Sequence, residues 1–275
     1  MDTGDPIAEI VRTADRDRWL ADLTAPPEAR PHLFALHALA AEIARIPGLV
    51  SDPTLGEIRL QWWHDALHGD PSGHPVAEAA KAAIARFSLP LSAFDRLIEA
   101  RVFDLYNDPM PDLATFEGYA GDTASGLVQL AAIVLAGGRD PGTAEAAGHA
   151  GVALAIAGRL RSLGRDAAER RFFLPADRAA TAGLDLGGLF AGQATPELRA
   201  FLAGMCDVAR RHLGSARAAL AGADRAVLPA FLPLALVEAE LKRMEKAADP
   251  LRDAGGLSPF RRQWLIWRAA RRGRV

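Results

Sequence analysis

A chain of 275 residues with a net charge of −2 carries no overall charge that points to one class of partner. Half of its residues are hydrophobic and only 7% are aromatic, so we expect a core of small and aliphatic side chains, which favours packed helices over a β-sandwich. The longest apolar run, residues 126–138, is too short to span a bilayer, and the single cysteine, Cys206, excludes an intramolecular disulfide. Residues 1–10 contain no apolar segment of the kind found in a secretory signal. We therefore expect a cytoplasmic protein in which Cys206 is a small buried side chain.

Stretches rich in glycine and proline divide the chain into about nine segments of helical length. These stretches are residues 69–75, 88–92, 107–111, 137–142, 183–188 and 248–259. Apolar residues between them recur at spacings of three and four and almost nowhere alternate. Because there is no internal repeat and no long linker, residues 1–275 are predicted to form one all-α domain, a bundle of about nine or more helices.

The predicted helix over residues 56–67 ends in a pair of histidines. His64 and His68 lie one turn apart on the same face, a spacing that can bind zinc. A zinc site needs a third ligand, which the pattern lacks, so we expect no metal site and assign His68 to the helix C-terminus, where it interacts with the dipole. Of the neighbouring Trp62 and Trp63, one is expected to pack in the core and the other to lie at the surface.

Two later segments, residues 119–138 and 144–163, are apolar on nearly all sides and rich in alanine and glycine. We predict that they are the central helices of the bundle, because small side chains let helices approach closely. The next helix is predicted to begin after Thr195 as its cap, with Pro196 in the first turn. Its apolar stripe consists of Leu198, Phe201, Leu202, Met205, Ala209, Leu213, Ala216 and Leu220.

The end of the chain is strongly basic, with ten Lys or Arg against three Asp or Glu from residue 242 to residue 275. A basic amphipathic helix is predicted over residues 258–272. Its aromatic face consists of Phe260, Trp264, Trp267 and Ala270, and the arginines around it are Arg261, Arg262, Arg268, Arg271, Arg272 and Arg274.

Tryptophan together with arginine on one amphipathic helix is typical of an anchor on an anionic membrane surface. The residues predicted to face the membrane are Trp264, Trp267, Arg261, Arg262, Arg268 and Arg271. The alternative is a last bundle helix that docks by its aromatic face and leaves the arginines in solvent. We expect no nucleic acid as a partner, because no nucleic-acid-binding module accompanies the charge.

Four stretches together resemble the squalene/phytoene synthase family: residues 33–45, 56–67, 104–132 and 150–175. The last is the most specific, since a small-residue helix runs into a charged segment that closes in Phe173-Leu174-Pro175. The resemblance implies the all-α isoprenoid synthase fold around a central cavity. It also implies two aspartate-rich clusters that face each other across the cavity and hold Mg²⁺ ions against the diphosphates of two prenyl substrates.

Most of those aspartates are absent from this chain. The residues at the first cluster are Ala44, Arg45 and Gly48, with Glu42 nearby, and those at the second are Ser162, Arg165 and Asp166. Asp104 matches one further acidic position of the family. Because scattered carboxylates cannot form paired Mg²⁺ sites, we expect no metal and no cofactor. The pattern is similar to a divergent branch of the family that includes a mitochondrial complex I assembly factor.

The leading hypothesis is a non-catalytic protein on the inner face of a membrane that acts in assembly with a protein partner or binds a lipid or isoprenoid. The arginines over residues 159–171 form either a solvated helix face or a phosphate-binding face that works without metal. The candidate ligand-binding residues are Arg161, Arg165, Arg171, Glu42 and Arg45. The alternative is a Mg²⁺-dependent transferase that condenses two farnesyl or geranylgeranyl diphosphates, and its remnant acids are Asp104, Asp122 and Asp166.

Overall fold

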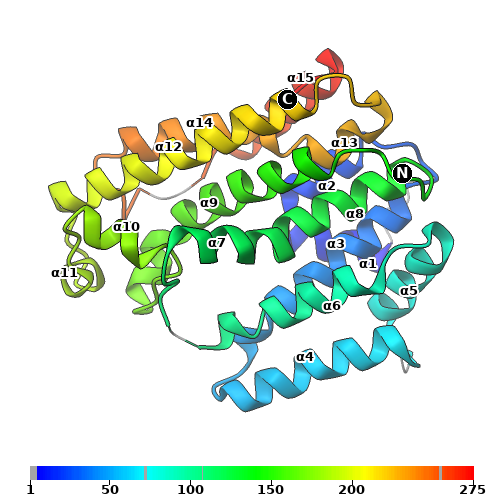
Figure 1. Ribbon diagram of the computed structural model, residues 1–275, viewed down its shortest axis with the longest axis horizontal. Coiled ribbons are helices and arrows are strands. Elements are labelled where there is room, and N and C mark those ends of the chain that lie inside the picture. The colour runs from blue at the N-terminus through cyan, green and yellow to red at the C-terminus, as the bar shows by residue number, and fades with distance from the viewer. Residues whose placement is uncertain (1–4, 71–72, 107, 254–255) are drawn as a thin grey trace.

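The computed structural model describes residues 5–70, 73–106, 108–253 and 256–275, and over these ranges the regular elements are helices and one isolated bridge between Met110 and Pro175 (Figure 1). Residues 71–72, 107 and 254–255, which belong to three predicted breaks between helices, lie outside the described residues. The all-α prediction is confirmed.

The helices follow one another with short connections. The first six are α1 (Pro6–Ala14), α2 (Arg16–Asp22), α3 (Arg30–Ala44), α4 (Pro53–His68), α5 (Pro75–Phe87) and α6 (Leu91–Ala100). The next six are α7 (Leu113–Ala120), α8 (Gly126–Leu135), α9 (Ala144–Ala168), α10 (Ala176–Thr181), α11 (Leu186–Phe190) and α12 (Pro196–Ala219). The last three are α13 (Leu228–Phe231), α14 (Leu234–Lys246) and α15 (Pro259–Arg272). Shorter elements are the 3₁₀ turns η1 (Ile46–Leu49), η2 (Phe103–Leu105) and η4 (Arg225–Val227) and the π-helix η3 (Gly121–Ser125).

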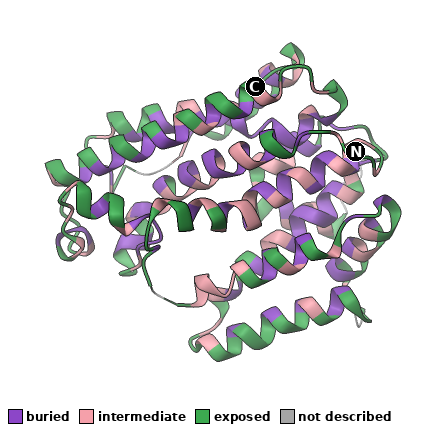
Figure 2. Ribbon diagram, viewed as in Figure 1, coloured by how far each residue is buried: buried purple, intermediate pink, exposed green. Residues whose placement is uncertain are grey.

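The two segments predicted to be central lie inside the bundle as α8 and α9. Helix α9 runs along α12 and also packs against α8, α14 and η3 (Figure 1). Gly151 on α9 permits this close contact, because a Cβ atom there would collide with the backbone of Ser125 in η3. Figure 2 shows buried residues concentrated on α3, α8 and α9, so the main hydrophobic core lies between these helices.

The predicted helix caps are also confirmed. The Thr195 hydroxyl accepts a hydrogen bond from the Leu198 amide at 3.2 Å and begins α12, whose predicted stripe is buried from Leu198 to Ala216. The Ser258 hydroxyl accepts one from the Arg261 amide at 3.4 Å and begins α15.

The tryptophan pair on α4 divides between core and surface as predicted. Trp63 is buried, whereas Trp62 is 38% exposed.

The bundle surrounds a cavity of about 940 Å³ that is open to solvent, in keeping with the predicted fold class. Its wall is built by α3, α7, η3, α9 and α14, with further residues from the turns after α1, α3 and α6. Among the helices in the described ranges, none has an apolar stretch long enough to cross a membrane.

Candidate functional site

The positions of both expected aspartate clusters line the central cavity. Ala44, Arg45 and Gly48 lie on one wall, at the end of α3 and in η1. The opposite cluster lies on α9 and consists of Ser162, Arg165 and Asp166. The positions of the two expected clusters therefore face the same cavity, as the family resemblance implies, but most of them carry residues other than aspartate.

Asp104 in η2 is held by three donors that converge on its carboxylate. The Arg101 guanidinium donates at 2.8 Å, the Arg159 guanidinium at 3.1 Å and the Tyr119 hydroxyl at 2.8 Å. Burial, together with the nearby negative charge of Asp104, raises the pKa of Tyr119 to about 12, so this hydroxyl remains a donor at neutral pH. The carboxylate is 8% exposed and engaged on both oxygens, which makes it part of an internal ion-pair network.

The other remnant acids are engaged in the same way. The Ser162 hydroxyl donates to Asp166 at 2.6 Å, and the Arg165 Nε atom lies 3.7 Å from the same carboxylate. Glu42 is buried outside the cavity lining and pairs with Arg45 at 2.8 Å. Each of these carboxylates has a donor beside it that competes with any cation for its oxygens.

A second buried ion-pair network joins the two ends of the chain. Arg262 on α15 donates to Asp17 on α2, to Glu240 on α14 and, at 3.1 Å, to the Leu257 carbonyl oxygen. Arg161 on α9 adds its charge at 3.7 Å from Asp17 and 3.6 Å from Glu240.

This network corrects one prediction. Arg262 does not face a membrane, because it is only 9% exposed and its guanidinium neutralises two carboxylates inside the bundle. The prediction grouped Arg262 with the other arginines of the last helix. In the structure it lies on the buried face of α15, three and four residues before Leu265 and Ile266, where carboxylates from other helices pair with it.

Three arginines present exposed guanidinium groups to the cavity. The exposed fractions of the side chains are 60% for Arg45, 41% for Arg161 and 72% for Arg165. Arg171 lines the cavity as well, but it pairs with Glu169 and lies over the ring of Phe173, with 5.7 Å between its guanidinium carbon and the ring centre. The wall that would carry aspartates in the family pattern is therefore positively charged.

These residues do not fit the paired Mg²⁺ sites that the family resemblance implies. Mg²⁺ binds through carboxylate oxygens in near-ideal octahedral geometry. Along the cavity, Asp17, Asp104 and Glu240 are bound by arginines, and Asp166 by Ser162. In the part of the chain that the structure describes, no three acidic or histidine side chains of the cavity wall bring their ligand atoms within 4.8 Å of one another.

The last helix presents its aromatic face to solvent. Phe260 is 79% exposed, Trp264 44% and Trp267 52%. The helix docks instead through Leu265, Ile266 and Ala269, which pack against residues of α2 and α14. The alternative in which the aromatic face docks on the bundle is therefore wrong.

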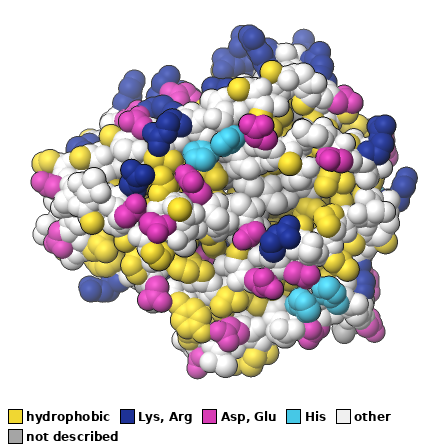
Figure 3. Space-filling view, viewed as in Figure 1, with side chains coloured by type: hydrophobic (Ala, Val, Ile, Leu, Met, Phe, Trp, Pro, Cys, Tyr) yellow, Lys and Arg dark blue, Asp and Glu magenta, His cyan; other side chains and the backbone are white. Residues whose placement is uncertain are grey.

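The exposed tryptophans carry arginines on their rings. The Arg268 guanidinium lies 4.4 Å from the ring centre of Trp264, and the Arg271 guanidinium 5.0 Å from that of Trp267. Arg261 is exposed as well. Figure 3 shows basic side chains gathered at the top of the molecule, where Figure 1 places α15. Membrane contact by these residues stays a prediction.

Sequence reasoning did not predict which residues meet at Asp104. Arg101 had a local signal, because it stands three residues before Asp104. Tyr119 and Arg159 had none, since they come to Asp104 from 15 and 55 residues away. Only the folded chain brings these groups to one carboxylate.

Comparison with known proteins identifies the family. A family model described as squalene/phytoene synthase matches residues 11–268. The chain is 30% identical, over 86% of its length and 72% of the relative, to the NADH dehydrogenase (ubiquinone) complex I, assembly factor 6, of Bos taurus. It is 28% identical to a phytoene synthase of Thermus thermophilus, covering 78% of this chain and 77% of that one.

A solved structure with the same fold is squalene synthase HpnC from Alicyclobacillus acidocaldarius. It superposes with a TM-score of 0.75 at 20% identity and covers 87% of this chain and 92% of its own. The chain belongs to the squalene/phytoene synthase family, and its similarity to assembly factor 6 agrees with the resemblance to the divergent branch.

Proposed function

We propose that this member of the squalene/phytoene synthase family is a non-catalytic assembly factor that works at a membrane surface without Mg²⁺ in its central cavity. One observation carries the proposal: the carboxylates of the cavity are paired with arginines or hydrogen-bonded by hydroxyls of the same chain. A transferase that ionises a prenyl diphosphate needs Mg²⁺ on the leaving group, and these carboxylates are not free to hold it.

The similarity to assembly factor 6 supplies the class of protein partner. We take that partner to be a subunit or assembly intermediate of a membrane-bound NADH dehydrogenase. An assembly factor needs no turnover, so loss of the acidic clusters would leave its role intact while the fold is kept as a binding scaffold.

Helix α15 supports the membrane part of the proposal. Its exposed Trp264 and Trp267 can enter the interface between head groups and acyl chains, while Arg268 and Arg271 lie beside anionic phosphates. Each arginine near such a surface contributes about 1 kcal/mol of attraction. The proposed place of the protein is therefore peripheral, on the inner face of a membrane.

The catalytic alternative is tested directly. Purified protein is incubated with farnesyl or geranylgeranyl diphosphate and Mg²⁺, beside an active phytoene synthase as positive control, and products are extracted and identified. We expect no squalene- or phytoene-like product. Product formation above a no-enzyme blank would overturn the non-catalytic proposal.

The membrane contact is tested by sedimentation with vesicles of phosphatidylcholine alone or with phosphatidylserine. We expect binding to the anionic vesicles only and a loss of binding when Trp264 and Trp267 are both changed to Ala. Trp62→Ala is the matched control, because Trp62 is exposed on α4, on the opposite edge of the bundle (Figure 1). Equal binding of all three proteins would contradict a contact through α15.

A second candidate function is favoured by the size of the cavity and its exposed arginines. A volume of about 940 Å³ can take an isoprenoid chain, and Arg45, Arg161 and Arg165 can bind a diphosphate or phosphate head group through guanidinium donors alone. Calorimetry with a non-hydrolysable farnesyl diphosphate analogue, with and without Mg²⁺, tests it. Binding that is indifferent to Mg²⁺ supports this function, whereas no binding excludes it and Mg²⁺-dependent binding restores the transferase reading.

A further inference from the structure

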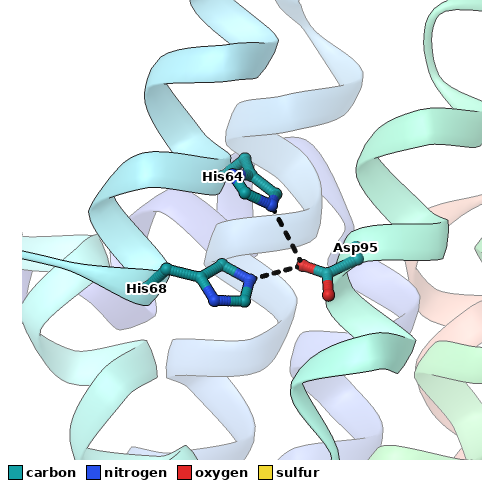
Figure 4. Close-up of side chains that lie close together, drawn as sticks. All are labelled: His64, His68 and Asp95. Carbon is teal, nitrogen blue, oxygen red and sulfur yellow. Dashed lines mark hydrogen bonds and ion pairs between the residues drawn. The ribbon is translucent and has the colours of Figure 1, made fainter.

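A histidine and aspartate cluster lies on the outer edge of the bundle, away from the cavity. His64 and His68 stand one turn apart on α4, and their rings stack with 4.4 Å between centres. Asp95 on α6 faces both of them (Figure 4). In Figure 3 a pair of histidine side chains lies next to acidic side chains over α4, at the lower edge of the molecule. The fold therefore supplies the third group that the sequence pattern of α4 lacks.

The three side chains are arranged as metal ligands. The Nε2 atom of His68 lies 2.8 Å from Oδ1 of Asp95, and the Nε2 atom of His64 lies 3.8 Å from the same oxygen. One ligand atom from each residue lies within 4.8 Å of the other two. Tetrahedral zinc with ligand bonds of about 2.0–2.1 Å keeps its ligand atoms about 3.3 Å apart, so small side-chain rotations suffice to admit the ion.

Two side chains beside the cluster, Gln61 and Asp65, orient the imidazole of His64. Its Nδ1 atom lies 3.2 Å from Oδ1 of Asp65, and the Gln61 amide donates to that same oxygen at 2.7 Å. With Nδ1–H donated to a carboxylate, Nε2 carries the lone pair and points to Asp95, which is the arrangement that metal-bound histidines adopt.

The charge of the cluster also suits a cation. In the described chain, the hydrogen bonds and ion pairs of Asp95 are made with the two imidazoles, and no arginine or lysine neutralises it. An imidazole can release its proton and offer a lone pair, which the guanidinium groups of the cavity cannot do. Two imidazoles and one carboxylate are a ligand set that suits zinc rather than Mg²⁺.

We propose that His64, His68 and Asp95 form a Zn²⁺ site with an open fourth position that water or a partner group fills. On binding, the ion replaces the hydrogen bond between His68 and Asp95: neutral His68 carries its ring proton on Nδ1 and offers the Nε2 lone pair to the ion, while Asp95 offers a carboxylate oxygen. The bound ion ties α4 to α6 and so fixes α4, which otherwise lies at the edge of the bundle with Leu55, Ile58 and Trp62 exposed on it.

The test uses the full chain after metal removal with a chelator and dialysis. Zn²⁺ is titrated in competition with a chromophoric chelator, and the thermal midpoint is recorded with and without Zn²⁺. We expect one ion per chain and a rise of the midpoint on zinc addition. His64→Ala, His68→Ala and Asp95→Asn are each expected to weaken binding by at least about tenfold, and Asp65→Asn by about tenfold.

Two histidine variants outside the cluster test whether zinc binding depends on the α4–α6 residues. His32→Ala removes a histidine that packs on Phe87, and His212→Ala removes one that contacts His149 and Glu117, so both leave the α4–α6 cluster intact. Circular dichroism of each metal-free variant shows that it is folded. Unchanged affinity in folded His64→Ala and Asp95→Asn, or loss of binding in His212→Ala alone, would overturn the proposal. None of these readouts depends on prenyl transfer, membrane contact or the protein partner, so the proposed function can fail while the zinc site stands.

Discussion

The wall of the central cavity and the α4–α6 edge both place carboxylates beside nitrogen-bearing side chains, yet they are suited to different chemistry. In the cavity the partners of Asp104 are Arg101 and Arg159, which stay protonated and can only donate. At the edge the partners of Asp95 are imidazoles, which can give up a proton and become ligands. Whether a carboxylate can bind a metal here therefore depends on the side chains beside it: guanidinium groups compete with the metal, whereas imidazoles can bind the metal as well.

The two regions also differ in what they contribute to the fold. The cavity networks are buried and link helices that are far apart in sequence, as with Arg262 and Asp17. The edge cluster is partly exposed, with 38% of the His68 side chain and 26% of the Asp95 side chain accessible. Buried pairs cost several kcal/mol to break, whereas exposed ones are worth about 0–1 kcal/mol. Substitutions in the buried networks should therefore lower the free energy of unfolding much more than substitutions in the edge cluster.

The largest effect is expected from Arg262→Ala. The change leaves the buried Glu240 and the partly buried Asp17 without their main partner, so the free energy of unfolding should fall by about 3–5 kcal/mol. Urea denaturation followed by circular dichroism measures it. Arg261→Ala, one position away but exposed, is the control and should lie within about 0.5 kcal/mol of the parent. Equal losses for the two variants would mean that the network does not hold α15.

Next in size is Asp104→Asn. Arg101, Arg159 and Tyr119 lose an anionic acceptor, and the free energy of unfolding should fall by about 1–3 kcal/mol. Because the negative charge of Asp104 adds to burial in raising the pKa of Tyr119 to about 12, an ultraviolet titration should show that pKa falling in the variant. Asp122→Asn is the control, since its half-exposed side chain lies 3.5 Å from the exposed Arg96. An unchanged titration would show that Asp104 does not interact with the phenol.

A smaller effect on stability but a clear one on binding is expected from Arg165→Ala. Its side chain is 72% exposed, so unfolding should change by less than about 0.5 kcal/mol. If the cavity binds a prenyl diphosphate analogue, loss of this guanidinium should weaken binding by about tenfold, the equivalent of one charge-assisted hydrogen bond. Calorimetry measures the change, and Arg178→Ala, outside the cavity lining, is the comparison. Identical affinities would place the ligand elsewhere.

The smallest effect is expected from His68→Ala without metal. An exposed contact with Asp95 contributes about 0–1 kcal/mol, so the thermal midpoint of the zinc-free protein should hardly move. The difference between parent and variant should appear only after zinc is added. A large destabilisation already in the zinc-free state would show that the cluster is a structural contact of the kind found in the cavity.

Much of the fold follows from local pattern. The stripe on α12 and the caps Thr195 and Ser258 were predictable because side-chain caps and a 3.6-residue period act over a few residues. The positions of the cavity walls followed from the family resemblance. The partners within the cavity did not, since Arg159 reaches Asp104 across 55 residues.

Helix α15 shows most clearly which features depend on the sequence alone and which depend on tertiary packing. Its sequence determined that a basic amphipathic helix begins at Ser258 and that Trp264 and Trp267 share a face. Tertiary packing alone decided that this face points to solvent, because Leu265, Ile266 and Ala269 pack against α2 and α14.

The charged and potential metal-binding groups show the same distinction between sequence and tertiary structure. By itself the sequence determined the helices and the loss of the acidic clusters, since both depend on residue type and on spacing along one helix. Only the tertiary structure decided which charges meet. It buried Arg262 between Asp17 and Glu240 and brought Asp95, 27 residues from His68, to the histidine pair. Electrostatic and coordination contacts depend on distances between helices, and such distances are set by how whole helix faces pack.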